Sequence, residues 1–421
     1  MKPRTRLTAA VLATLLLLPA TTAGAWTKRP RPSEVPVAET APAPDDFQLY
    51  NDYASPERTY SSKRVVVHYV ELGIDAPPLN DDDGGGVPDY VARVGEAADR
   101  ALAYYERRGF RAPLADEGGP DARPDLYVSR FAPGTLGVAF PAADAQGGAF
   151  AVVSNNLDPS PERSFASVYA TVAHELFHLV QFSYFGQAEP AIPTWILEGT
   201  AAALESRVNP RLDDLVSALQ LRRWFSATER SITEQSYGAQ LLWRRLDAEQ
   251  PRLLPALFRR LAAEPVEGEG ERAVAATYAR VAGKPFAPAF HRFAVSVAGE
   301  HADSIEPVLS VRPGTTRHLA VAPLAVHYVR PLLPRGGAYS LTVTFPRGRG
   351  SAAATLTYEL ESEIAGTPPR VGRIAARSSD GGRTLTVDVP VRLRKSARLT
   401  NPLLVVSNGG ERPVVYAVSA R

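Results

Sequence analysis

The feature that most constrains this chain is an apolar segment, residues 170–184, which reads A-T-V-A-H-E-L-F-H-L-V-Q-F-S-Y. It contains no Gly or Pro and is apolar almost all round, so we expect a buried helix. We expect that helix to begin near Ser160, since Ser is a good N-cap and Pro161 suits the first helical position. His174, Glu175 and His178 interrupt its apolar surface.

These three residues have the spacing of a metal site. His174 and His178 are four residues apart and therefore share one helix face, where both imidazoles reach a single zinc ion at roughly 2.0–2.1 Å. Glu175 lies about a quarter-turn further round the helix, where its carboxylate meets a zinc-bound water and acts as general base. The alternative interpretation is a pair of core histidines.

A catalytic zinc site uses three protein ligands and keeps a fourth position for water. The candidate third ligand is Glu198, in the helical segment P-T-W-I-L-E-G-T-A, residues 193–201. The separation from His178 suits a loop and a second helix that crosses the first, with Gly199 as part of a small surface for close packing. His174, His178 and Glu198 then form a two-His, one-Glu site.

H-E-x-x-H at 174–178 followed by W-x-x-E-G-x-A at 195–201 resembles the gluzincin zinc metallopeptidases. The resemblance implies that Glu198 is the third zinc ligand and that the fold is a small mixed sheet with a helical lobe. The segment D-x-x-x-G-x-P-D-Y at 82–90 also resembles a poorly characterised group of secreted bacterial gluzincin-like peptidases. The resemblance covers about residues 60–300.

Three further residues are candidates for supporting roles. Gln181 is on the ligand face as an outer-shell or substrate contact, with plain packing as the alternative. Glu205, seven residues past Glu198, is placed to orient a ligand imidazole, with a solvated helix charge as the alternative. Gluzincins often use a Tyr or His to stabilise the oxyanion, and Tyr237 is the nearest candidate, although we favour core packing for it.

A second cation site is a candidate at N-D-D-D-G-G-G-V-P-D-Y, residues 80–90. Asp81, Asp83 and Asp89 match calcium-loop positions 1, 3 and 9. Position 5 is Gly85 and position 12 is Ala92, where a bidentate Glu belongs. Calcium binding and a Gly-rich turn both remain open.

The composition limits the partners. With 47 basic and 45 acidic residues the net charge is +2, which gives no electrostatic case for nucleic acid or an anionic membrane. Lys2, Arg4 and Arg6 before an apolar run and A-G-A at 23–25 predict a signal peptide cleaved near Ala25. That run is too short to span a bilayer. The absence of cysteine fits a bacterial exported protein, extracellular or periplasmic, that does not depend on disulfides.

The remaining pattern predicts an α+β protein. Residues 64–70 read as a strand in which His68 is a packing residue, and residues 90–108 carry an amphipathic stripe. Three short strands are expected between 124 and 155, one of which is an edge that can hold an extended peptide, and helices from 212 to 297. Residues 312–421 read as an all-β sandwich with an accessory role. The expected domains are a signal peptide 1–25, a Pro-rich tether 26–46, a catalytic domain 47–311 and the β-sandwich 312–421.

Taken together, the sequence predicts a secreted zinc-dependent peptidase whose substrate is a protein or peptide, with Zn2+ and a candidate Ca2+ as cofactors. Two alternatives remain. One is a non-catalytic surface or binding protein on a peptidase scaffold, and the other is a zinc hydrolase of a non-peptide bond.

Overall fold

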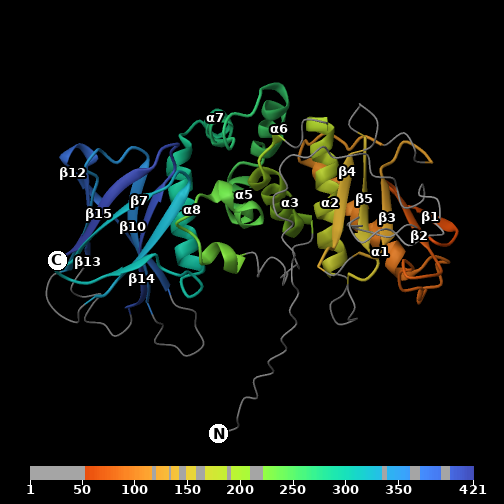
Figure 1. The fold of residues 1–421 in the computed structure, drawn as a ribbon, viewed down its shortest axis with the longest axis horizontal. Coiled ribbons are helices and arrows are strands. Elements are labelled where there is room, and N and C mark those ends of the chain that lie inside the picture. The colour runs from red at the N-terminus through yellow and green to blue at the C-terminus, as the bar shows by residue number, and fades with distance from the viewer. Residues whose placement is uncertain are drawn as a thin grey trace, which may run out of the picture. The chain divides into compact units, whose positions relative to one another are not determined.

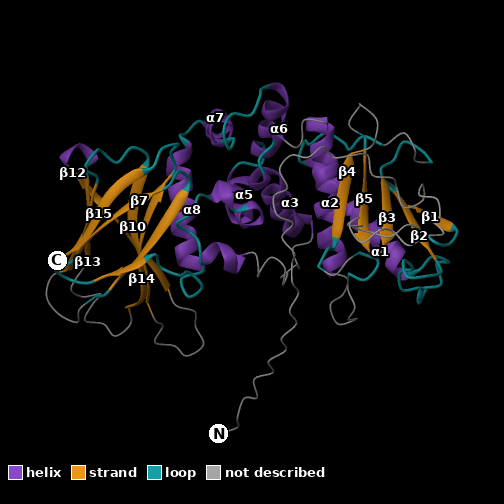
Figure 2. Ribbon diagram, viewed as in Figure 1, coloured by secondary structure: helices purple, strands orange, loops and turns teal. Residues whose placement is uncertain are grey.

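The protein is an α+β structure whose described strands form three five-stranded sheets (Figures 1 and 2). The computed structural model describes residues 53–115, 120–131, 134–141, 148–157, 166–186, 191–208, 221–333, 339–360, 370–389 and 399–421. The expected signal peptide, the tether and the helix start at Ser160 lie outside these ranges. The described residues fall into two compact units, one within Met1–Pro190 and Glu205–Leu212, the other within Ala191–Leu204 and Asp213–Arg421.

The first unit is built on a mixed sheet with the strand order β1-β2-β3-β5-β4. Its strands are β1 (Glu57–Ser61), β2 (Val66–Val70), β3 (Asp125–Ser129), β4 (Gly137–Pro141) and β5 (Ala149–Ser154). The three central strands are parallel, and both edge strands run antiparallel to their neighbours. The central strands are buried along almost their whole length, as parallel strands are when both faces are covered.

Helices α1 (Asp89–Arg107) and α2 (Ala166–Phe185) pack on each other and on this sheet. The Tyr105 hydroxyl on α1 donates a hydrogen bond of 2.7 Å to the carbonyl of Ala173 on α2. The Phe177 ring meets Tyr105 and Phe110 edge-on, with centroids 5.0 and 5.1 Å away. These contacts fix α2 at the turn that carries the two histidines.

The second unit begins with the first part of α3 (Thr194–Val208) and continues into a helical segment. Its helices are α5 (Gln240–Glu249), α6 (Leu253–Ala263), α7 (Glu271–Ala282) and α8 (Phe286–Glu300), preceded by the turns η3 (Ile232–Glu234) and η4 (Ser236–Ala239). Trp195 stacks on Trp243 with ring centroids 5.0 Å apart, and the Trp243 indole donates to the Trp195 carbonyl at 2.7 Å. A Cβ at Gly199 would lie 2.9 Å from Trp243. The sequence predicts that Gly199 is part of a surface of small residues that packs on the histidine helix. In the structure, the missing side chain of Gly199 instead makes room for the Trp243 indole.

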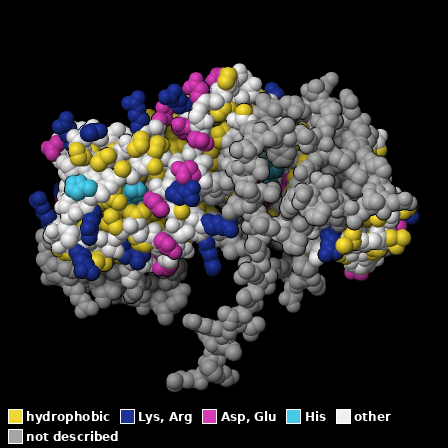
Figure 3. Space-filling model, in the orientation of Figure 1, with side chains coloured by type: hydrophobic (Ala, Val, Ile, Leu, Met, Phe, Trp, Pro, Cys, Tyr) yellow, Lys and Arg dark blue, Asp and Glu magenta, His cyan; other side chains and the backbone are white. Residues whose placement is uncertain are grey.

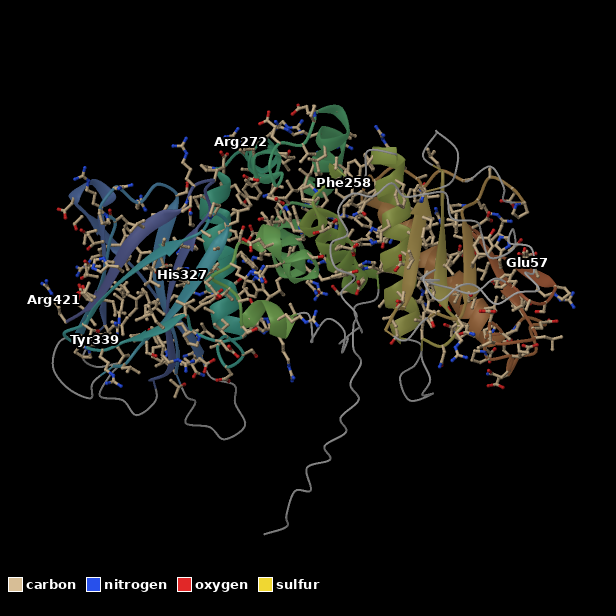
Figure 4. All side chains as sticks on the ribbon, in the orientation of Figure 1. Glu57, Phe258, Arg272, His327, Tyr339 and Arg421 are labelled. Atoms are coloured by element: carbon tan, nitrogen blue, oxygen red, sulfur yellow. The ribbon has the colours of Figure 1, made fainter. Side chains whose placement is uncertain are left out.

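The C-terminal part consists of two five-stranded sheets that share one apolar core, as the predicted sandwich requires. The first sheet has the order β11-β10-β14-β8-β6 and the second the order β12-β13-β9-β15-β7. The strands are β6 (Leu309–Val311), β7 (Thr316–Val321), β8 (Ala325–Pro331), β9 (Tyr339–Thr344), β10 (Ala352–Leu360), β11 (Arg370–Ala375), β12 (Arg377–Ser379), β13 (Thr384–Val389), β14 (Leu399–Asn408) and β15 (Val414–Ala420). On β8, His327 (Figure 4) is hydrogen-bonded through Nδ1 to the Tyr416 hydroxyl at 2.8 Å.

Helix α8 lies against β10 and β14 of this sandwich. Its His291 is hydrogen-bonded to the hydroxyls of Ser407 at 2.8 Å and Thr355 at 2.9 Å. Burial lowers the pKa of His291 to about 4, so the imidazole is neutral at pH 7. Partly buried hydrogen bonds thus join residues on the two sides of the expected boundary at 311/312. The division into two compact units falls elsewhere, with one of its limits within α3.

Among the described residues, no helix is both long and apolar enough to cross a membrane. On the face drawn in Figure 3, basic and acidic side chains are interspersed over the described surface.

An ionic cluster joins three strands at the β1 side of the first sheet, where Figure 4 labels Glu57. The His68 ring on β2 contacts Glu57 through Nδ1 at 2.7 Å and Asp125 through Nε2 at 3.0 Å, and it stacks on Tyr127. Asp125 is completely buried. Burial alone would lower the pKa of His68, but its hydrogen bonds to the Asp125 and Glu57 carboxylates outweigh burial and raise the pKa to about 9. His68 is therefore a buried cation between two carboxylates. The sequence predicts only a packing role for it.

Replacing His68 with Gln is expected to destabilise the first unit by on the order of 3 kcal/mol at pH 7, because the buried Asp125 and the partly buried Glu57 lose their cation. The folded pKa lies above the ordinary value of 6.5, so this stabilisation is complete below about pH 6.5 and is lost as the pH rises through about 9. Urea unfolding across this pH range measures it, with His318→Gln, an exposed histidine, as the control. A His68→Gln midpoint equal to wild type at pH 7 contradicts the account.

Candidate metal centre

Helix α2 presents the H-E-x-x-H residues inside the protein. Most of its other residues are apolar, and His174 and Glu175 are each 7% exposed among them. The His174 and His178 rings lie on one face with centroids 4.8 Å apart and nearly perpendicular planes. The four-residue spacing thus brings the two imidazoles together, as the sequence predicts.

Each imidazole is held through its Nδ1 atom. His174 Nδ1 is 2.7 Å from Glu205 Oε1 on α3, and His178 Nδ1 is 2.7 Å from Gln181 Oε1, one turn further along α2. Because a carboxylate and an amide oxygen only accept, both Nδ1 atoms carry the proton. In the neutral form of each ring, Nε2 is then the lone-pair nitrogen, which is the arrangement that ligand histidines adopt.

Glu198 joins the two histidines from α3. It lies seven residues before Glu205, so both carboxylates are on the same face of that helix. His174, His178 and Glu198 each offer one ligand atom, and these atoms lie within 4.8 Å of one another. The structure therefore brings together the three residues that the sequence predicts as ligands, with Gln181 and Glu205 in contact with the two rings.

This donor set fits zinc. Two neutral imidazole nitrogens and one carboxylate match the preference of Zn2+ for nitrogen and oxygen donors, and three protein ligands leave a fourth position for water or substrate. Gln181 is completely buried, which holds its amide in place against His178.

Glu175 faces edge strand β4, a relation that the sequence does not reveal. A Cβ added to Gly137, the first residue of β4, would lie 2.7 Å from Glu175 Cγ and 2.8 Å from its Oε1. The glycine lets the strand backbone come within van der Waals distance of the carboxylate. In the sequence, a Gly at the end of a strand indicates only a turn. The contact between Gly137 and Glu175 is recognised only from the tertiary packing.

If Glu175 is the general base of a zinc hydrolase, as the sequence predicts, replacing Gly137 with Ala is expected to displace the Glu175 carboxylate and lower hydrolysis by about 10²-fold, while zinc content stays at wild-type level. The control is Val138→Ala, which removes volume from the adjacent position and should leave the rate within a factor of about two or three. Metal analysis and kcat/KM on the same preparations measure the effect. A Gly137→Ala rate equal to that of wild type would mean that the strand does not position Glu175.

The second candidate site folds around its own carboxylates. Asp81, Asp83 and Asp89 offer ligand atoms within 4.8 Å of one another. Asp81 accepts hydrogen bonds from the backbone N–H groups of Gly85 and Gly86 at 2.9 and 2.8 Å, and Asp83 accepts one from Gly85 at 2.9 Å. Asp89 lies in the first turn of α1, where a negative charge is favourable. These contacts are compatible both with a calcium-binding loop and with a Gly-rich turn, so calcium binding stays a prediction.

Tyr237 lies in η4 and is only half-buried, so it is less enclosed than the core position that we favour from the sequence. Its role in stabilising an oxyanion stays a prediction.

No protein-family model matches this sequence, and no curated protein is significantly similar to it. Among solved structures, the chain is similar to the pre-peptidase C-terminal domain of a collagenase from Bacillus anthracis, with 13% identity and a TM-score of 0.19. The match covers 28% of this chain and 97% of that domain. A similarity at this level carries no inference about fold or function.

Proposed function

We propose that the protein is a zinc-dependent peptidase in which His174, His178 and Glu198 hold the metal and Glu175 is the general base. The observation that carries the proposal is the cluster of the three ligand atoms within 4.8 Å, on helices whose Glu205 and Gln181 orient the two imidazoles. Glu175 is adjacent to one of these ligands in sequence and is nearly buried.

Zinc, when bound there, supplies a Lewis acid that polarises the scissile carbonyl and lowers the pKa of water. Glu175 accepts the proton of the attacking water and delivers it to the leaving nitrogen, so one carboxylate serves as base and then as acid. Its enclosure between α2 and β4 limits the access of bulk solvent to this proton. Glu205 and Gln181 keep the ligand rings in a fixed orientation during the reaction.

A peptide substrate is supported by the position of β4. In the described sheet β4 pairs with β5 alone, so it is an edge strand, and its first residue adjoins Glu175. An extended peptide added along β4 forms main-chain hydrogen bonds with it and brings a peptide bond next to the base. Main-chain pairing favours peptides over small esters or sugars as substrates.

The test is hydrolysis of an unstructured protein such as casein by the full-length chain, with and without a zinc chelator, alongside a panel of non-peptide ester substrates. The proposal predicts proteolysis that the chelator abolishes and added zinc restores. Hydrolysis of the esters alone would indicate a zinc hydrolase of another bond. A zinc-loaded protein inert toward every substrate would indicate a non-catalytic binding protein.

A further inference from the structure

The first unit contains a cavity of about 710 Å³ at the carboxyl ends of its parallel strands. It is lined by the segment that follows β2, including Ile74 and Pro77, by Arg130 after β3, and by Asn155 after β5. The carboxyl ends of parallel strands are where open α/β sheets bind ligands, because several connecting segments converge there. Nothing in the proposed zinc chemistry uses this cavity.

The cavity wall is held by buried polar groups. The Asp75 carboxylate, 2% exposed, accepts hydrogen bonds from the Ser129 hydroxyl and the Arg130 backbone N–H, each at 3.0 Å. The Asn155 side chain donates to the carbonyls of Ile74 and Ala76, both at 3.0 Å. These hydrogen bonds thus hold the ends of β3 and β5 to the segment after β2. Because the pocket is already formed before a ligand binds, little binding free energy is lost in ordering its residues.

Among the described residues, one charged side chain lines the cavity, and it is positive. Arg130 is exposed, and none of the described side chains forms an ion pair or hydrogen bond with its guanidinium. None of the described residues that line the cavity is acidic. Ile74 is 56% exposed at its edge, and Phe131 and Leu136 add apolar surface. The lining therefore suits a carboxylate attached to a short apolar stem.

The cavity also adjoins the proposed reaction centre along the chain. Thr135 and Leu136 line it, and the next residue is Gly137, which lies against Glu175. A strand advances about 3.3 Å per residue, so a peptide with its scissile bond at Glu175 reaches the cavity within one to three residues. A peptide paired antiparallel with β4 runs opposite to it, so these are the residues after the cleaved bond.

We propose that this cavity is a substrate subsite in which Arg130 binds a carboxylate located one to three residues after the cleaved bond. The inference rests on the proposed peptidase function. The carboxylate belongs either to an acidic side chain or to the C-terminus of the peptide, and the guanidinium recognises both through paired N–H donors.

The test uses quenched fluorescent peptides derived from a casein sequence that the enzyme cleaves. Each pair differs only by Glu or Gln at the first, second or third position after the cleaved bond. A further pair ends in a free carboxylate or an amide. Wild type is expected to prefer the carboxylate by about tenfold in kcat/KM, through KM, at one of these positions. A preference within the Glu and Gln pairs indicates that the carboxylate belongs to a side chain. A preference within the terminal pair indicates that it belongs to the C-terminus of the peptide.

Arg130→Gln is expected to reduce that preference to near one by raising KM for the carboxylate peptide. Arg107→Gln, an exposed arginine on α1, is the matched control and should keep the preference. A wild-type preference below twofold at all positions, or a preference that survives Arg130→Gln, overturns the subsite.

If no peptide is cleaved, the proposed function fails, and the subsite is then tested by binding. Fluorescence anisotropy of the Glu and Gln peptides with the Glu175→Gln protein gives their affinities. A carboxylate preference that Arg130→Gln removes supports the subsite independently of hydrolysis, and equal affinities contradict it.

Discussion

Glu175→Gln is expected to retain one zinc per chain and to lose hydrolysis by about 10³-fold, a typical contribution of general acid–base catalysis. The amide has nearly the shape of the carboxylate and can still lie beside Gly137, but it cannot accept the proton of the attacking water. The metal ligands are unchanged, so the loss should appear in kcat rather than in zinc affinity.

Zinc content by elemental analysis and kcat on a casein-derived peptide measure this on one preparation. A variant in which hydrolysis persists at more than about one tenth of the wild-type rate would assign the base to another group. Loss of zinc together with activity would instead mean that Glu175 is needed to build the site.

Glu198→Ala is expected to lower zinc affinity by more than about 100-fold, beyond the roughly 10–100-fold expected from loss of an outer-shell partner. The change removes one of three protein ligands and leaves His174 and His178 on α2 alone. Ala suits a helix interior, so α3 should persist, held by Trp195 and its contact with Trp243.

The comparison variant is Glu205→Gln on the same helix face. It keeps a hydrogen-bonding group near His174 Nδ1 but removes its charge, so it should weaken zinc binding by the smaller, outer-shell amount. Competition with a chromophoric chelator gives both affinities. If the two variants bind zinc equally well, or Glu198→Ala binds as tightly as wild type, Glu198 is not a ligand.

The parts of the structure that local pattern determines were predictable from the sequence. The α1 stripe, the strands β2 to β5 and the alternating strands of the sandwich repeat with helix or strand periodicity over enough residues to identify them. The H-E-x-x-H spacing likewise acts within one helix. By contrast, β1 is a short, mostly exposed edge strand with polar residues, and it has no such pattern.

What the sequence does not reveal depends on which segments meet. His68 lies between Glu57 and Asp125 only because the sheet order places β2 between β1 and β3. The same order makes β4 an edge, and the packing of α2 brings Glu175 to Gly137. An amphipathic stripe shows that α8 buries one face but not which element covers it. The change to β-rich sequence at 312 therefore does not reveal the His291 contacts with the sandwich.

The measurement that tests the central claim most directly is a zinc titration of the metal-free, full-length protein, with casein-peptide hydrolysis followed at each addition. The account predicts that activity rises linearly and stops at one zinc per chain, and that Glu175→Gln takes up the same single equivalent with no activity above about 10⁻³ of wild type. Activity in the metal-free protein, or activity unrelated to the first equivalent of zinc, would contradict a zinc centre at His174, His178 and Glu198.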